Sequence, residues 1–336
     1  MKIFIPIIIL FILNSCQVKV KKIKNLYSEN QIIATTISEF IKKLPSDSSI
    51  EIKTYDGSGQ VVHPDVLWNK NELIMGITPY PYYIDSLENP CLYKSYDGVN
   101  FTDYMKDINP IVKKPIIDHN CDPDIFFNKK GELVIYYIEM LRPKFNNVIA
   151  LTQKNKSSVF KKSTILNYNL KKNEPLIMSP SIMFNNKKNE YVLYFVNNDL
   201  KYNRIETIIS KKDYNFKKEN TKTPNIEFPK NYSPWHLDVI KGDDEKYYLL
   251  TTGYYGNPLN DNYSLYLAES KDLINWTNNH EILNKKNIPY KNLKYVYRSS
   301  ALIADNKIAI WYSYTTKGAT KDLTPTWHLA LKKLNL

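Results

Sequence analysis

The feature that most constrains the fold is a short sequence pattern that occurs five times along the chain. Each copy is a strand-like run of six residues, and its third residue is Pro64, Pro123, Pro180, Leu237 or Ser299. These positions are 59, 57, 57 and 62 residues apart. Such a regular period indicates a repeat protein in which every copy belongs to one structural unit.

A second pattern repeats in phase with the first. It starts at Ser95, Ser210 and Ser270, with a weaker copy at Thr152, so the starts are 57, 58 and 60 residues apart. The residue types predict a tight turn followed by an aromatic side chain that packs between neighbouring units. The expected packing residues are Phe101, Phe216 and Trp276.

A unit of about 58 residues with three or four short strands predicts a propeller blade, because radial repetition of small sheets leaves few exposed edges. The expected fold is all-β, a five-bladed β-propeller with four strands in each blade and a short N-terminal helix. The propeller should span residues 46–336, with blades near 60–105, 118–162, 176–218, 233–279 and 295–336. The last blade lacks a strand, and the alternating residues 50–55 are predicted to complete it.

The N-terminus carries the features of an export signal. Lys2 precedes an apolar run, Ile3 to Leu13, which is too short to cross a bilayer, since that takes roughly 20 residues. The run ends in Asn14-Ser15-Cys16, which resembles a lipobox. The prediction is a signal peptide over 1–16 and a lipid on Cys16, placing the protein in the bacterial cell envelope, on the outer membrane or cell surface. An ordinary cleaved signal with a chance cysteine is the alternative.

Residues 17–45 are expected to form a basic tether and one amphipathic helix. Ser28 and Gln31 have capping-box spacing, and apolar residues then follow at helical spacing. The predicted helix covers residues 29–44 and ends at Pro45.

Charge and cysteine content limit the partners of this chain. The net charge of +12 comes from scattered lysines rather than an arginine-rich stripe, which argues against nucleic-acid binding. It is compatible with a mild attraction to acidic glycans or lipids. Cys91 and Cys121 lie in apolar strand patterns, so buried free thiols are expected rather than a disulfide. The protein is expected to be a monomer.

Candidate functional residues lie at the starts of the five repeated strands, which should meet around one channel mouth. In each copy of the motif, one candidate directly precedes the third position and another directly follows it. Across the five copies these residues form two columns. Because side chains alternate along a strand with a period of two, both columns should lie on the same side of each strand. Capping of the backbone is the structural alternative for any single member. The first column is His63, Asp122, Ser179, His236 and Arg298, and the second is Asp65, Asp124, Ser181, Asp238 and Ser300.

These patterns resemble the five-bladed propeller superfamily of glycoside hydrolase family 43, the levansucrase and invertase group, and the family 130 mannoside phosphorylases. The resemblance covers about residues 60–336. The residues that carry it are the five strand starts, with Asp122-Pro123 the closest match, the turn Ser95 to Phe101, and the segment Tyr83 to Pro90 that ends in Glu88-Asn89-Pro90.

In family 43 the resemblance implies an inverting glycosidase with an Asp base, a second orienting Asp and a Glu acid. Here only Asp122 matches directly: His63 stands in place of the first Asp and Met178 in place of the Glu. Asp65 is then the candidate base, and Glu88 or Asp238 the candidate acid if burial raises its pKa.

The prediction is an exported glycoside hydrolase that acts on an oligo- or polysaccharide. Asp65, Asp122, Asp124 and Asp238 are the candidate catalytic residues. Tyr80 and Tyr82 are further candidate sugar platforms, with inter-blade packing as the alternative. The candidate substrate-binding residues are His63, Glu88, Trp235, His236, Tyr297 and Arg298.

A non-catalytic glycan-binding propeller is the main competing hypothesis, because the third-blade Glu is missing. A phosphorylase is the third, since Arg298 and His236 could hold phosphate. No cofactor and no metal are expected, because the two histidines lack a short ligand spacing.

Overall fold

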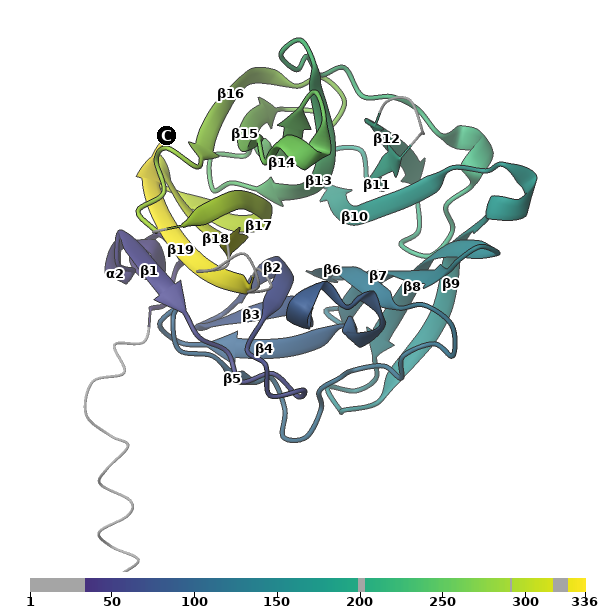
Figure 1. The fold of residues 1–336 in the computed structure, drawn as a ribbon, viewed down its shortest axis with the longest axis horizontal. Helices are drawn as coiled ribbons and strands as arrows, with labels where there is room; N and C mark the ends of the chain where they lie inside the picture. The colour runs from purple at the N-terminus through teal and green to yellow at the C-terminus, as the bar shows by residue number, and fades with distance from the viewer. Residues whose placement is uncertain (1–33, 199–202, 291, 317–325) are drawn as a thin grey trace, which may run out of the picture. The chain divides into compact units, whose positions relative to one another are not determined.

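The computed structural model describes residues 34–198, 203–290, 292–316 and 326–336. Within them the chain forms five antiparallel sheets arranged as the blades of a propeller, which confirms the predicted fold class (Figure 1). The predicted signal, Cys16 and the tether lie outside the described residues, as does the start of the predicted helix. No helix in the described part is long and apolar enough to cross a membrane.

Each blade runs outward from its first strand. Blade one contains β2 (Val61–Asn69), β3 (Glu72–Pro79), β4 (Cys91–Ser95) and β5 (Thr102–Asp103). Blade two contains β6 (Asn120–Phe127), β7 (Leu133–Leu141), β8 (Phe145–Gln153) and β9 (Phe160–Asn169). Blade three contains β10 (Leu176–Asn185), β11 (Glu190–Asn198) and β12 (Asn203–Ser210).

Blade four contains β13 (Tyr232–Lys241), β14 (Tyr247–Tyr255), β15 (Tyr263–Ser270) and β16 (Thr277–Asn284). Blade five contains β17 (Leu293–Ala304), β18 (Lys307–Thr316), β19 (Trp327–Asn335) and β1 (Asp47–Ile50). One α-helix, α2 (Ile37–Lys43), precedes the propeller. Short 3-10 turns connect strands: η1 (Pro81–Tyr83), η2 (Asp85–Leu87), η3 (Leu170–Lys172), η4 (Lys218–Asn220) and η5 (Pro258–Asn260).

The first strands of the blades line the centre of the ring. They contact one another in chain order, from β2 through β6, β10 and β13 to β17, and β17 returns to β2. Because these strands carry the repeated motif, the ring brings all five copies together, as the period predicts.

The closing strand has different bounds from those predicted. Residues 47–50 form β1, which pairs antiparallel with β19 and places Ile50 opposite Leu329. Pairing with the C-terminal blade is thus confirmed, but the range 50–55 was wrong. The strand begins two residues after Pro45, and the chain turns further on, where Gly57 N–H donates to the Thr54 carbonyl.

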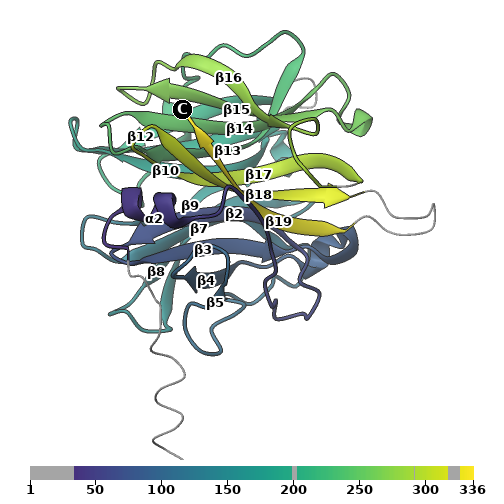
Figure 2. The same cartoon turned by 90° about the vertical axis from the view of Figure 1, so that its left-hand side faces the viewer.

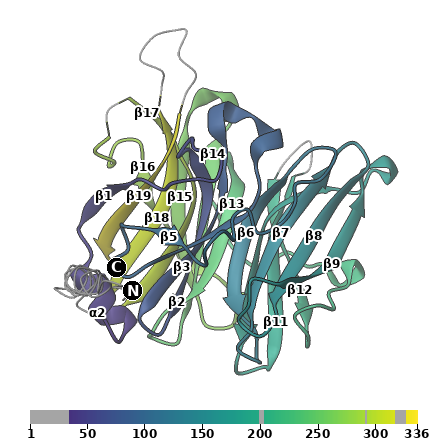
Figure 3. The same cartoon turned by 90° about the horizontal axis from the view of Figure 1, so that it is seen from below.

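Among the described residues the helix covers Ile37–Lys43, and residues 34–36, which the predicted range 29–44 includes, are not helical. Thr36 is its N-cap and accepts a hydrogen bond from Glu39 N, while the Glu39 carboxylate accepts from Thr35 N. The arrangement is similar to a capping box, shifted by one residue, and it fixes the start of the helix. Helix α2 lies beside β17 and β18 (Figure 2). Lys333 near the C-terminus donates to the carbonyl of Leu44, the residue after the helix. Figure 3 shows strands β1 and β19 side by side.

Blade three has three strands in the described residues, where four were expected. The segment after β12 forms two isolated bridges instead of a strand, one between Thr207 and Lys222 and one between Asn225 and Asn275. Pro224 and Pro229 lie in this segment, and a proline cannot donate to a strand ladder.

The second repeated motif forms the predicted turn. In blade four Asp272 accepts from Ile274 N and Asn275 N, and Ser270 caps Leu273 N. The following Trp276 is buried and packs edge-on against Tyr194 of blade three, with ring centroids 6.0 Å apart. The packing role is confirmed for Trp276, and the free, buried states of Cys91 and Cys121 are confirmed as well.

Substitution of Gly98 tests the seam between helix α2 and blades one and five. Gly98 has φ +76, and an added Cβ would lie 2.5 Å from Leu44 and 3.2 Å from Phe40 and Trp311. Gly131, with φ +72 and open space around it, is the matched control. We expect Gly131→Ala to cost about 1 kcal/mol of backbone strain, and Gly98→Ala about 1–3 kcal/mol more from overpacking. Chemical denaturation of both variants measures the difference, and equal losses would contradict this packing.

Candidate functional site at the centre of the ring

The repeated motif distorts every first strand at its start. The pairing of first and second strands shifts register at the motif, for example between Val62 and Asp65 and between Cys121 and Asp124. His63, Asp122 and Ser179 adopt positive φ angles of 57, 54 and 51. A β-bulge of this kind redirects a side chain, and strained backbone is common at functional sites.

The bulges separate the two predicted columns into two groups. Atoms of His63, Asp122 and His236 form one group, within 4.8 Å of one another. The carboxylates of Asp65, Asp124 and Asp238 form the other. The single funnel of acids, histidines and arginine that a period of two predicts was therefore wrong, because the bulge breaks that period between the columns.

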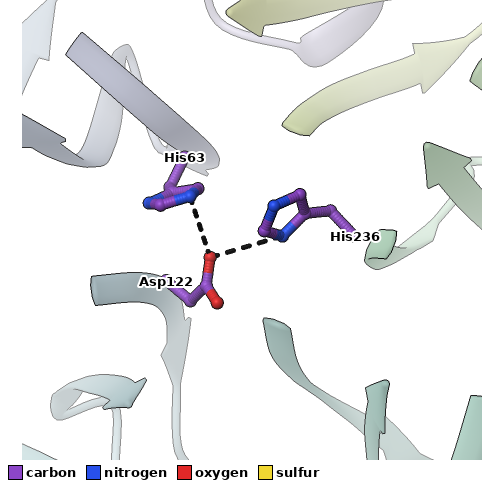
Figure 4. A group of neighbouring side chains, drawn as sticks. All are labelled: His63, Asp122 and His236. Atoms are coloured by element: carbon purple, nitrogen blue, oxygen red, sulfur yellow. Dashed lines mark ion pairs between the residues drawn. The ribbon is translucent and has the colours of Figure 1, made fainter. Parts of the chain in front are cut away.

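The first group, the histidine–aspartate cluster, joins strands β2, β6 and β13 through one carboxylate oxygen (Figure 4). Asp122 Oδ1 lies 3.2 Å from His63 Nε2 and 3.4 Å from His236 Nδ1. The other oxygen, Oδ2, accepts a hydrogen bond of 2.9 Å from Ser179 N. All three side chains are at least 95% buried.

Burial and neighbouring charges set the protonation of this cluster. Burial lowers the pKa of His63 to about 4 and that of His236 well below its ordinary value. Burial would raise the pKa of Asp122, but His63, His236, Arg298 and the Ser179 N–H outweigh it and keep that pKa low. At neutral pH the cluster therefore holds two neutral imidazoles and one carboxylate, the state in which these side chains bind metal ions.

Several polar atoms of the cluster face no hydrogen-bonding partner among the described residues. These atoms are His63 Nε2, Asp122 Oδ1 and both ring nitrogens of His236. Buried polar atoms are nearly always satisfied, so orphaned atoms that converge on one point indicate a missing ligand or solvent. The lack of a short ligand spacing in the sequence does not exclude a metal here, since the three residues come from three different blades.

Glu88 lies next to the ring nitrogen of His63 that faces away from Asp122. Its Oε2 atom is 3.5 Å from His63 Nδ1, which also contacts Thr78 Oγ1 at 2.7 Å. Burial, followed by the charges of Asp122 and Asp85, raises the pKa of Glu88 well above its ordinary value. Burial and the neighbouring carboxylates therefore favour the protonated form of Glu88.

A chain of polar residues that the sequence reasoning missed runs outward from Glu88. His119 Nε2 lies 3.8 Å from Glu88 Oε1, and His119 Nδ1 lies 2.6 Å from Asp118 Oδ1. Asp118 in turn accepts from Arg142 Nε at 2.6 Å. His119 could have been found from its place three residues before Asp122, whereas no local pattern marks Arg142.

Aromatic side chains surround the histidine–aspartate cluster. The Tyr297 ring lies 4.4 Å from that of His236 and 5.5 Å from that of His63, and Trp235 Nε1 donates to the Tyr297 hydroxyl at 3.0 Å. Trp327, which the sequence reasoning missed, lies 4.9 Å from Tyr297. Tyr80 stacks on Trp327, so it packs between blades one and five. Tyr82 is 55% exposed.

The second group, the aspartate ring, links neighbouring blades. Asp65 accepts from Ile125 N at 2.5 Å and Asp124 from Ile182 N at 3.1 Å. The serines of the same column do likewise, since Ser181 accepts from Val239 N and Ser300 from Val66 N. These contacts favour a structural role for the column, and a catalytic role for Asp65, Asp124 or Asp238 remains a prediction.

Arg298 lies close to both groups and has no exposed surface. Its Nη1 atom is 3.5 Å from Asp122 Oδ1, and its charge also lowers the pKa values of the aspartate ring. The pKa of Asp124 is nevertheless raised to about 7, by burial and then by the charge of Asp238. Arg298 is thus the positive charge that balances several buried acids.

Comparisons with known proteins support the fold. No family model matches the chain. The chain is 24% identical over 262 residues to the A type blood N-acetyl-alpha-D-galactosamine deacetylase of Flavonifractor plautii, which covers 65% of this chain and 34% of that protein. The chain therefore spans about a third of the length of this relative.

Three solved structures illustrate the likeness. An N-acetylgalactosamine deacetylase from F. plautii, in complex with blood group B trisaccharide, has a TM-score of 0.70 at 19% identity, covering 88% of this chain and 95% of that one. An α-L-arabinofuranosidase from Podospora anserina has a TM-score of 0.61 at 11% identity, covering 87% and 99%. An exo-1,5-α-L-arabinanase from a bovine ruminal metagenomic library has a TM-score of 0.58 at 16% identity, covering 82% and 94%. The chain has the five-bladed fold of these enzymes, as the resemblance implied.

Proposed function

We propose that this protein is a carbohydrate-active hydrolase that removes the N-acetyl group from an amino sugar in a glycan, with the help of a divalent metal ion. The observation that carries the proposal is the convergence of His63, Asp122 and His236 with orphaned, buried ligand atoms. The F. plautii deacetylases, similar in sequence and in fold, support the choice of an N-acetylated sugar.

The residues of the cluster fit a metal ion by type and by number. Two imidazoles and one carboxylate are a frequent ligand set of catalytic zinc sites, which leave a position open for water or substrate. Thr78 contacts Nδ1 of His63, and the other ring nitrogen, Nε2, faces Asp122. In metal sites the histidine nitrogen that does not bind the metal is often held by such a neighbouring polar group. A cation held here would polarise the amide carbonyl and lower the pKa of a water molecule.

The remaining residues of the site have separate tasks. Burial raises the pKa of Glu88 and favours its protonated form, so Glu88 can donate a proton to the amide nitrogen that leaves as an amine. His119, held by Asp118, lies next to Glu88 and positions it. Tyr297 and Trp235 form an aromatic wall beside the histidines, which suits the apolar face of a sugar ring.

Hydrolysis of a glycosidic bond is the second candidate, and it keeps the sequence-based prediction. The pKa of Asp122 is lowered while burial raises that of Glu88, and two carboxyl groups with opposite pKa shifts are the usual pair of a glycosidase. The arabinanase and arabinofuranosidase structures of the same fold also favour it. Both candidates use the same site, so the product decides between them.

The test is product analysis with and without metal. The purified protein is incubated with N-acetylgalactosamine-containing oligosaccharides and with arabino-oligosaccharides, and acetate and new reducing ends are measured separately. We expect acetate release that falls by about 100-fold or more after chelation and returns on addition of Zn²⁺ or Mn²⁺. Reducing ends without acetate, unaffected by chelation, would instead establish the glycosidase. Glycan binding with neither product would establish a non-catalytic binding propeller.

The predicted lipid on Cys16 would place this activity in the cell envelope. That location remains a prediction, because Cys16 lies outside the described residues.

A further inference from the structure

A basic groove of about 510 Å³ lies between blades two and three, apart from the histidine–aspartate cluster. Six lysines line it, against two acidic residues, Glu132 and Asp213. We propose that this groove binds an acidic polysaccharide chain, whose sugars carry carboxylate or sulfate groups. The lysines are Lys129, Lys130, Lys154, Lys161, Lys211 and Lys212.

The groove is remote from the central site. Its residues come from the turn between β6 and β7, from strands β7, β8 and β9 of blade two, from the start of β11, and from the turn after β12. Asp122 lies near the start of β6, and Asn128 of the groove follows the end of the same strand. Six residues of strand separate them by about 20 Å. Binding in the groove therefore does not depend on the reaction proposed for the central site.

The positive charge of the groove is largely uncompensated. All six lysines are exposed, and Lys211 alone forms an ion pair with a described carboxylate, that of Glu190 at 3.3 Å. Lys129 Nζ donates to Asn189 Oδ1 at 2.6 Å and lies 4.4 Å from the Phe184 ring, so its position is fixed. A concave surface with one sign of charge concentrates ligands of the opposite sign.

An aromatic side chain in the groove favours a sugar over other polyanions. Tyr214 is 60% exposed, and Lys212 Nζ lies 5.7 Å from its ring centroid. An exposed ring can pack on a pyranose while the adjacent ammonium group binds an acidic substituent. The groove lining contains no arginine and one exposed ring, whereas single-stranded nucleic-acid sites combine arginines with several stacked rings.

The test measures binding of an oligogalacturonate by calorimetry, with a neutral malto-oligosaccharide and inorganic polyphosphate as comparison probes. The wild-type protein should bind the oligogalacturonate and not the neutral chain. The double variant Lys211→Glu/Lys212→Glu should weaken this binding by about tenfold or more. Lys271→Glu is the matched control, because Lys271 follows Ser270 as Lys211 follows Ser210 in the equivalent turn. This control should change binding by less than about twofold.

Tyr214→Ala tests whether the groove recognises a sugar ring or only negative charge, because it removes the aromatic ring and keeps every lysine. It should weaken oligogalacturonate binding by about five- to tenfold, which corresponds to the loss of one aromatic platform, and leave polyphosphate binding unchanged. A second charge variant, Lys130→Glu/Lys154→Glu, changes lysines of blade two instead of blade three. It keeps the test valid if the first double variant does not fold. Equal binding by wild type and both charge variants, or a Tyr214→Ala variant that keeps full oligogalacturonate affinity, would overturn the proposal.

Discussion

Replacement of Asp122 by Asn should abolish most of the activity while the protein stays folded. The expected fall in turnover is about 1,000-fold or more, because one charged oxygen of Asp122 faces both histidines and Arg298. Asn has nearly the same shape, and its amide oxygen can still accept the hydrogen bond from Ser179 N. Turnover of the substrate identified by product analysis, and metal content of the purified variant, are the measurements.

Asp65→Asn is the matched control for this experiment. Asp65 is equally buried and lies in the same strand motif of another blade, but its carboxylate bonds to Ile125 N of blade two. We expect Asp65→Asn to keep turnover within about tenfold of the wild type and to lower stability instead, by about 1 kcal/mol. If Asp65→Asn were inactive and Asp122→Asn active, the sequence-based assignment of Asp65 as the base would be right.

The fold could be predicted from the sequence because each blade carries its own copy of the same local information. Two motifs with one period give the number of blades and their order without any knowledge of tertiary contacts. Local competition between hydrogen bonds is harder to predict. The helix starts at Ile37 because Thr35, Thr36 and Glu39 cap it, and β1 covers 47–50 although residues 51–55 continue the same alternation.

The candidate site could be predicted only in part, for a geometric reason. The residues before and after each motif centre were expected on one side of the strand, which holds for regular β-structure. The bulges, together with positive φ at His63, Asp122 and Ser179, place the two columns in separate groups. His119, Arg142 and Trp327 reach the site through contacts between distant segments, and no repeat marks them.

Arg298→Met should cause the largest loss of stability among the substitutions at the centre of the ring. Arg298 is completely buried, and its charge opposes the mutual repulsion of Asp122 and the aspartate ring. Removal of one partner from a buried charge network costs about 3–5 kcal/mol, because the other charges stay buried without compensation. Chemical denaturation monitored by tryptophan fluorescence gives the free energy of unfolding.

Two further variants separate the charge of Arg298 from its packing. Arg142→Met removes an arginine that also pairs with aspartates but is 46% exposed, so its cost should stay within about 1 kcal/mol. The double variant Arg298→Met/Asp238→Asn removes one buried positive and one buried negative charge, and it should be more stable than Arg298→Met alone. If Asp238→Asn instead lowered the free energy of unfolding of Arg298→Met further, Arg298 would stabilise the protein by packing. The buried acids would then be neutralised by protonation alone.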